Sequence, residues 1–156
     1  MHIVIQPNDF NISYIFLSEK AKNNILNGGD FYRILYSTPC MTLNGIFISL
    51  KINISSYDEY FNKIKCYVNP SENKQTVDFI QHFEKELLTN IPDMEHLTPD
   101  YKIMDQLKMN FIKIINDGNS YNMTKLTTEI NIILKVSGIW TNGNNYGLTF
   151  RFFIHP

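Results

Sequence analysis

Basic and aromatic side chains share one side of an alternating pattern in several segments of this chain. Residues 60–68 show the pattern most sharply, because Ile64, Cys66 and Val68 fall on one side and two lysines and two aromatic residues on the other. Aromatic rings can stack on unpaired bases while neighbouring cations hold phosphates, which is the chemistry of a surface for single-stranded nucleic acid. The candidate residues for this chemistry are Phe47, Lys51, Phe61, Lys63, Lys65, Tyr67, Lys135, Arg151 and Phe153.

The same pattern is also typical of ordinary solvent-exposed sheet, where lysine lies beside half-buried phenylalanine or tyrosine. Taken one strand at a time, that second interpretation is favoured. The pattern recurs on at least three predicted strands. This recurrence adds support to the nucleic-acid interpretation without making it the favoured one. The residues alone leave both open.

The residues that most often carry catalysis or bind metals are scattered. The four histidines stand at no metal-ligand spacing from one another or from a cysteine. Cys40 and Cys66 form no CxxC motif, and the NGGD string at 27–30 lacks the Lys and Ser/Thr of a phosphate-binding loop. We therefore expect no enzymatic activity, no metal and no cofactor.

Length and composition set further bounds. A chain of 156 residues can bury one core, so we expect a single domain over residues 1–156. A formal net charge of −1 supplies no global attraction to a polyanion, so nucleic-acid binding would need a local patch. The two cysteines are expected as buried, reduced thiols. No signal peptide or long apolar run is evident, which predicts an intracellular protein without membrane contact.

The elements that must position the candidate residues are mostly strands. Alternation predicts strands at 12–17, 31–36, 43–54 and 60–68, a turn at 116–122 and a terminal hairpin over 130–154. One clear helix follows residue 70, and 102–115 fits a short helix running into a strand. Strands interrupted by one prominent helix predict a mainly β fold, an OB-like antiparallel barrel with the helix after the third or fourth strand.

The pattern also assigns faces to individual side chains. In 43–54 the isoleucines point to the core, while Phe47 and Lys51 point away, and Gly45 marks a bend. In the helix, Ser71 is the expected N-cap and Glu84 lies on the outer face. In the hairpin, Trp140 falls in the apolar row and is expected in the core.

The terminal hairpin and two earlier segments carry a family resemblance. The strings ILKVSGIWTNGNNYGLTFRF, FYRILYSTP and LNGIFISLKI resemble the OB-fold single-stranded DNA-binding proteins of large (nucleocytoplasmic) DNA viruses, which are similar to T7-type phage single-strand binders. There a hydrophobic strand ends at Gly-Ile/Val-Trp, and a strand led by Tyr/Phe-Gly closes the barrel. The matching residues are Gly138, Ile139, Trp140, Tyr146 and Gly147.

The resemblance implies a non-enzymatic protein that binds single-stranded nucleic acid, with DNA the expected kind, in viral replication, recombination or repair. It implies a location in the host cytoplasm, at a viral factory, or in the nucleus. The alternative is a β-rich virion component or protein-interaction module, in which the same aromatic residues form a subunit interface and the chain is a homo-oligomer. The sequence does not separate DNA from RNA or identify protein partners.

Overall fold

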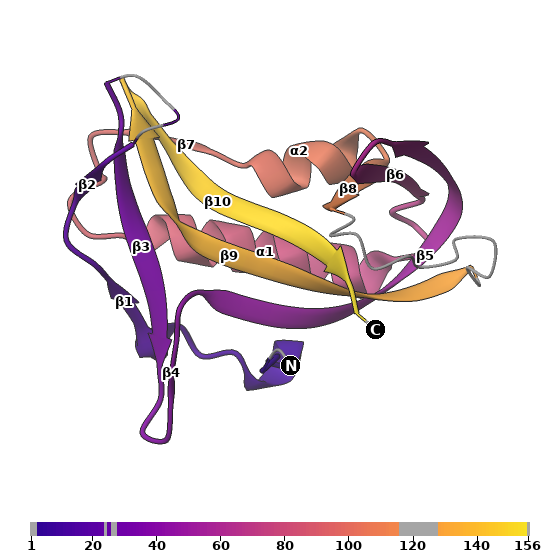
Figure 1. The fold of residues 1–156 in the computed structure, drawn as a ribbon, viewed down its shortest axis with the longest axis horizontal. Helices are drawn as coiled ribbons and strands as arrows, with labels where there is room; N and C mark the ends of the chain where they lie inside the picture. The colour runs from indigo at the N-terminus through magenta and orange to yellow at the C-terminus, as the bar shows by residue number, and fades with distance from the viewer. Residues whose placement is uncertain (1–2, 24, 26–27, 116–127, 156) are drawn as a thin grey trace.

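The computed structural model describes residues 3–23, 25, 28–115 and 128–155, and it is mainly β (Figure 1). The turn expected at 116–122 lies outside these residues. The strands are β1 (Ile15–Leu17), β2 (Ala21–Lys22), β3 (Asp30–Ser37), β4 (Thr42–Leu43), β5 (Ile46–Tyr60), β6 (Lys63–Val68), β7 (Thr98–Asp100), β8 (Phe111–Ile115), β9 (Glu129–Asn142) and β10 (Asn145–Ile154). The helices are α1 (Lys74–Thr89) and α2 (Lys102–Lys108), with short 3-10 turns at Pro7–Asp9 and Ile12–Tyr14.

Five of the strands close into a barrel, which confirms the expected OB-like architecture. β9 pairs antiparallel with β5 and with β10, β5 pairs with β6, and β6 pairs with β8. The ring closes where β8 runs parallel to β10, with Ile114 beside Phe152 and Ile115 beside Phe153. The order around the barrel is therefore β5, β6, β8, β10, β9.

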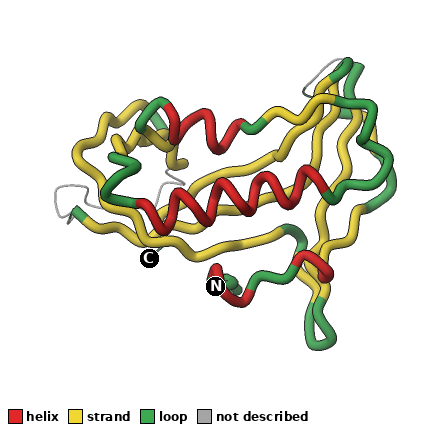
Figure 2. Tube along the Cα trace, turned by 180° about the vertical axis from the view of Figure 1, so that it is seen from behind, coloured by secondary structure: helices red, strands yellow, loops and turns green. Residues whose placement is uncertain are grey.

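The helices follow a different strand of the barrel from the one predicted. α1 and α2 both lie between β6 and β8, which are the second and third strands of the ring. The first two predicted strands are not strands of the ring, because they correspond to β1 and β3. β3 pairs with the second half of β9 and with β1, outside the ring. Seen from behind, α1 lies in front of the long strands and runs along the long axis of the molecule (Figure 2).

The core fills the barrel and the space under α1. Alternate residues of β5 and β6 are buried as predicted, while Phe47 is half-buried and Lys51 exposed on the other face. Gly45, at φ +114°, forms the expected bend before β5. Cys66 is in the core, but Cys40 is exposed, so the expectation of two buried thiols is wrong for Cys40. The inward residues of β5 and β6 are Ile46, Ile48, Leu50, Ile52, Ile54, Ile64, Cys66 and Val68.

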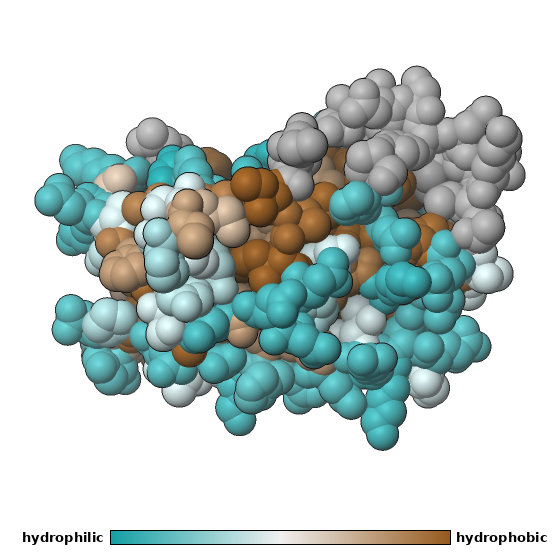
Figure 3. Space-filling view, turned by 90° about the horizontal axis from the view of Figure 1, so that it is seen from below, coloured by the Kyte–Doolittle hydropathy of each residue, from teal (hydrophilic) through white to brown (hydrophobic). Residues whose placement is uncertain are grey.

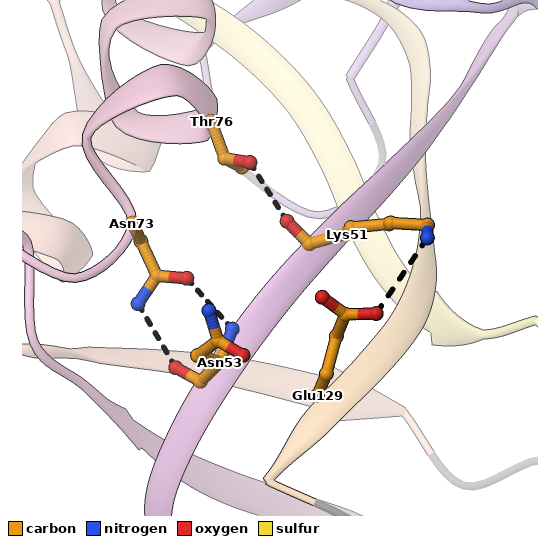
Figure 4. Close-up of polar contacts among 5 residues, drawn as sticks. All are labelled: Lys51, Asn53, Asn73, Thr76 and Glu129. Atoms are coloured by element: carbon orange, nitrogen blue, oxygen red, sulfur yellow. Dashed lines mark hydrogen bonds and ion pairs between the residues drawn. The ribbon is translucent and has the colours of Figure 1, made fainter.

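An asparagine, rather than the predicted Ser71, sits at the start of α1. The helix begins at Lys74, and the side chain of Asn73 makes no capping bond but reaches β5 instead. Asn73 Oδ1 accepts a hydrogen bond from the Asn53 N–H (2.6 Å), and its Nδ2 donates to the Asn53 carbonyl (2.9 Å), as Figure 4 shows. Thr76 Oγ1 donates to the Lys51 carbonyl at 2.7 Å. These bonds hold the start of α1 against one edge of β5.

Glu84 is buried, which contradicts its predicted place on the outer face of the helix. Its two carboxylate oxygens accept hydrogen bonds from the Ile103 and Met104 N–H groups at 3.0 and 2.9 Å. Glu84 therefore provides acceptors for two N–H groups in the first turn of α2 that have no acceptor within the helix. Burial raises the pKa of this carboxyl above its ordinary value, and the two N–H bonds act in the opposite direction. Helical spacing could not reveal this contact, because α2 arrives from later in the chain.

In the described part of the chain, no helix combines the length and the apolar character needed to cross a bilayer.

We predict that Glu84→Ala lowers the free energy of unfolding by about 2–6 kcal/mol, because two buried N–H groups lose their acceptor at about 1–3 kcal/mol each. Urea unfolding followed by far-UV circular dichroism measures the change. Glu95→Gln, at an exposed position, is the control and should change little. A loss below about 1 kcal/mol would contradict the structural role of Glu84.

The same group predicts a pH dependence. The pKa of Glu84 in the folded chain is raised above its ordinary value of 4.5. In the pH range between the ordinary and the raised pKa, the folded chain therefore holds a proton on Glu84 that the unfolded chain has lost. The contribution of Glu84 to unfolding free energy therefore falls as pH rises through this range. The stability advantage of wild type over Glu84→Gln should be larger near pH 4.5 than at pH 7, measured by urea unfolding at both. A pH-independent difference would refute this.

Candidate nucleic-acid interface

Two neighbouring barrel strands carry a dense group of basic and aromatic side chains on their outer surface. On β6, Lys63, Lys65 and Tyr67 alternate with inward residues, as predicted. On β8, Phe111 lies opposite Tyr67 and Lys113 opposite Lys65. Lys65 Nζ lies 5.0 Å from the Tyr67 ring centroid and 4.5 Å from that of Phe111, and Lys113 Nζ lies 5.6 Å from the Phe111 centroid. We call these five residues the β6–β8 cluster.

A carboxylate borders the β6–β8 cluster. Asp58 of β5 is the strand neighbour of Lys65, and its Oδ2 accepts a 2.7 Å hydrogen bond from Tyr67 Oη. This bond raises the pKa of the Tyr67 hydroxyl, because removing the proton would place two negative oxygens together, while Lys65 acts in the opposite direction. Tyr67 therefore keeps its proton at neutral pH, and the hydrogen bond orients its ring.

A second group of predicted residues forms a row across three strands. Lys135 of β9 is paired with Phe47 of β5 on one side and with Arg151 of β10 on the other. Lys135 Nζ lies 5.2 Å from the Phe47 ring centroid. All three point away from the core, as their positions in the alternation predicted. We call them the Lys135 row.

Phe153 connects the row to the cluster. It lies beside Ile133 of β9 and, through the parallel pairing that closes the barrel, beside Ile115 of β8. Ile115 in turn lies opposite Lys63. Directly paired residues point to the same side of a sheet, so the outer residues of β9, β10, β8 and β6 form one continuous belt. Lys63 and Phe153, far apart in sequence, are separated by a single strand.

Two predicted residues lie away from this belt. Phe61 was expected on a strand beside Lys63, but β5 continues to Tyr60 and a turn follows. Phe61 occupies that turn, with φ +49° and a fully exposed side chain. Lys51 points outward, but its Nζ lies 3.5 Å from Glu129 Oε1 (Figure 4). In this pair, Glu129 competes with a phosphate for the Lys51 ammonium group.

Lys51 also lines a hollow of about 560 Å³ between the N-terminal segment, β5 and the start of α1. Val4, Pro7 and Phe79 supply apolar walls, and Thr76 contributes a hydroxyl. Seen from below the view of Figure 1, this side of the molecule has a central apolar area between hydrophilic side chains (Figure 3). The mixed lining shows no convergent set of cations.

Phe111 and Lys113 are members of the cluster that the sequence analysis missed. Their signal was present, because Phe111, Lys113 and Ile115 alternate with Ile112 and Ile114. The segment 102–115 was correctly expected to be helix followed by strand. Without a boundary between the two, however, the outer face of the strand could not be assigned.

Trp140 lies on the outer surface, which contradicts its predicted place in the core. Thr149 pairs with Gly138, whereas Phe150 pairs with Val136, so the register skips Ser137. Such a β-bulge exchanges the two faces of the strand beyond it. Ile139 is consequently buried, and Trp140 is half-buried on the opposite side.

The Trp140 ring and its neighbour Phe31 each lie against a glycine. Trp140 is the strand partner of Phe31 and of Gly147. A Cβ atom on Gly147 would lie 2.8 Å from Trp140 Cζ2, and one on Gly138 would lie 2.7 Å from Phe31 Cε2. Both distances are too short for carbon atoms, so the two glycines are what allow the rings to rest on the strand backbone. The glycines of the Gly-Ile-Trp and Tyr-Gly strings thus have a steric role.

The belt carries side chains of the kinds that bind anions and stack on flat rings. Within the described residues, no three His, Cys, Asp or Glu side chains gather closely enough to hold a metal ion. At the border of the belt, Asp58 contributes a carboxylate. Comparison with protein-family models, with curated proteins and with solved structures gave no match.

We predict that Gly138→Ala lowers the free energy of unfolding by about 1–3 kcal/mol, because the new methyl group would collide with the Phe31 ring and the Tyr32 carbonyl. Thermal and urea unfolding measure the loss. Gly143→Asn is the matched control: Gly143 has φ +58°, which asparagine tolerates, and open space around its Cα. Equal effects at the two positions would mean that Phe31 does not rest on Gly138.

Proposed function

We propose that this protein binds single-stranded nucleic acid along the belt formed by the β6–β8 cluster, Phe153 and the Lys135 row. The observation that carries the proposal is the β6–β8 cluster, where three lysines surround two aromatic rings and two of them lie within cation–π distance. Stacking on such rings contributes about 1–3 kcal/mol per base, and the cations beside the rings bind the phosphates of the backbone.

The position of the cluster in the fold supports the same function. OB folds bind oligonucleotides on the face of the second and third barrel strands and at the loops joining strands one to two and four to five. Here β6 and β8 are the second and third strands of the ring. Phe61 lies in the first of those loops, fully exposed, and so remains a candidate for stacking on a base.

The distribution of charge fits a neutral protein with a local basic surface. Within the described residues, five cations lie on the belt, and the carboxylate of Asp58 lies at its border. The formal charge of the whole chain is nevertheless −1. Binding therefore depends on short-range contacts with the belt, and long-range attraction contributes little. The belt residues are Lys63, Lys65, Tyr67, Phe111, Lys113, Ile115, Phe153, Lys135, Phe47 and Arg151.

Binding a base requires the lysines to move. Phe111 is only 9% exposed, and Lys65 and Lys113 both rest over its ring. A base that stacks on this ring displaces the lysine side chains, whose ammonium groups then reach the flanking phosphates. A lysine has four rotatable bonds and can make this exchange without any movement of the backbone. DNA is the ligand we favour, with a role in viral replication, recombination or repair, on the family resemblance alone.

We predict that Lys63→Ala/Lys65→Ala weakens binding to a fluorescein-labelled oligo-dT and flattens its salt dependence. Each lysine that no longer reaches a phosphate of the single strand reduces the slope of log affinity against log salt by about 0.7, so the double variant reduces it by about 1.4. Fluorescence anisotropy over a series of salt concentrations measures both effects. Lys74→Ala/Lys85→Ala, which removes two exposed lysines from α1, is the charge-matched control and should leave the slope unchanged.

Equal slopes for wild type and the Lys63/Lys65 variant would remove β6 from the interface. Absence of any binding at low salt would refute the proposed function. If sedimentation then showed a large homo-oligomer insensitive to salt, the belt would be a subunit interface, as in the alternative drawn from the sequence.

A further inference from the structure

We propose that the hollow beside Phe31 and Trp140 is a pocket for a single unpaired base at one end of the bound strand. This inference rests on the proposed function and adds a site that the belt does not include. The hollow measures about 520 Å³ and lies where β2 and β3 meet the β9–β10 hairpin. That volume is within the range of about 300–1,000 Å³ typical of small-ligand sites.

The floor of the pocket is aromatic and built for a flat ligand. Phe31 and Trp140 line it as strand partners, and each has one side pressed against a glycine, Gly138 or Gly147. Neither ring belongs to the half-buried side chains that pack on the main core within the described residues. Two rings held in this way form a rigid apolar surface, and a base can stack on it with little loss of side-chain freedom.

The charges around the pocket favour a nucleic acid over an apolar side chain of a protein. Lys22 lines the hollow, and none of the described lining residues is acidic. Beyond the lining, Arg151 follows Thr149 on the outer face of β10, and Arg33 follows Phe31 on the outer face of β3, where its guanidinium donates to Asn44 Oδ1 at 3.1 Å. The carboxylate of Asp30, the strand partner of Lys22, is ion-paired with Lys20 at 3.2 Å. Lysine is depleted in protein interfaces, whereas a lysine beside stacking rings suits a phosphate-linked base.

The pocket is continuous with the belt. Thr149 lines the hollow, and the next two outward positions on β10 are Arg151 and Phe153. Arg151 belongs to the Lys135 row, and Phe153 leads through Ile115 to the β6–β8 cluster. A strand lying along the outer face of β10 would therefore pass from the cluster over the row and place its last base on Trp140.

The single tryptophan makes the pocket directly observable. Titrating the full chain with labelled oligo-dT at low salt, we expect Trp140 fluorescence to be quenched over the same concentrations that raise the anisotropy. Bound oligonucleotide should also protect Trp140 from acrylamide. N-acetyl-tryptophanamide with the same oligonucleotide corrects for absorption of the exciting light. These measurements need no variant, so they hold even where a substitution affects folding.

A substitution supplies the second test. Trp140→Ala should weaken binding measured by anisotropy about 5- to 150-fold, the loss of one stacked base. Phe16→Ala removes an exposed phenylalanine from β1 and is the control, which should bind as wild type does. Far-UV circular dichroism establishes that each variant is folded.

The outcomes separate this inference from the proposed function. A rise in anisotropy without quenching or protection of Trp140 would overturn the pocket and leave the belt standing. No rise in anisotropy at low salt would remove both. If Trp140→Ala bound oligo-dT normally but no longer formed a dimer that wild type forms, the hollow would hold a second copy of the chain, and the assignment of a base would be wrong.

Discussion

The parallel pairing of β8 with β10 is the contact on which the rest of the structure depends. β8 is a strand of five residues, and without β10 it would be the free edge of an open sheet. Backbone hydrogen bonds contribute about 0.5–1.5 kcal/mol each, so the two-residue register alone does not hold it. Burial of Ile112, Ile114 and Phe152 inside the ring stabilises the closure, at about 1.5–3 kcal/mol for each side chain.

The outer surface follows from that inner packing. Once Ile114 and Phe152 point inward as neighbours, alternation requires Ile115 and Phe153 to lie side by side outside. Selection for a filled core thus also determines which cations and rings meet on the belt. Two polar side chains help to position β8. Asn73 bonds the start of α1 to β5, and Glu84 of α1 bonds the first turn of α2, the helix that precedes β8.

Much of the fold could be predicted because its signals are local. The alternation in β5, β6 and β10 assigned Phe47, Lys65 and Arg151 to the outer face correctly, since the side-chain period of a strand is two regardless of its partners. The hairpin and the helix-then-strand over 102–115 were also recognisable. All of these depend only on residues close in sequence.

The errors came instead from pairings between distant segments. The bulge at Ser137 reverses the face of Trp140, and only the register of β9 against β10 reveals it. Glu84 looks like a surface residue until α2 packs over it. A lysine–aromatic alternation likewise shows what each strand presents, but not which strands lie side by side.

Under the proposed function, the arrangement of lysines over aromatic rings resolves a conflict between binding and solubility. Rings that can stack on bases would form an exposed apolar patch when empty, and such patches promote association. In this molecule Lys65 and Lys113 cover Phe111, and Lys135 lies over Phe47. An exposed cation–π contact is worth about 0.5–1 kcal/mol, less than the roughly 1–3 kcal/mol of a stacked base. At Phe47, where one lysine is displaced, the exchange favours the bound state. At Phe111, where two lysines are displaced, the contacts that their ammonium groups make with phosphates supply the rest of the gain. The Trp140 floor rests on Gly147, and no lysine of the described part of the chain lies over it at cation–π distance. An incoming base displaces no such cation there, so stacking at Trp140 should retain more of its free energy than stacking at the β6–β8 cluster.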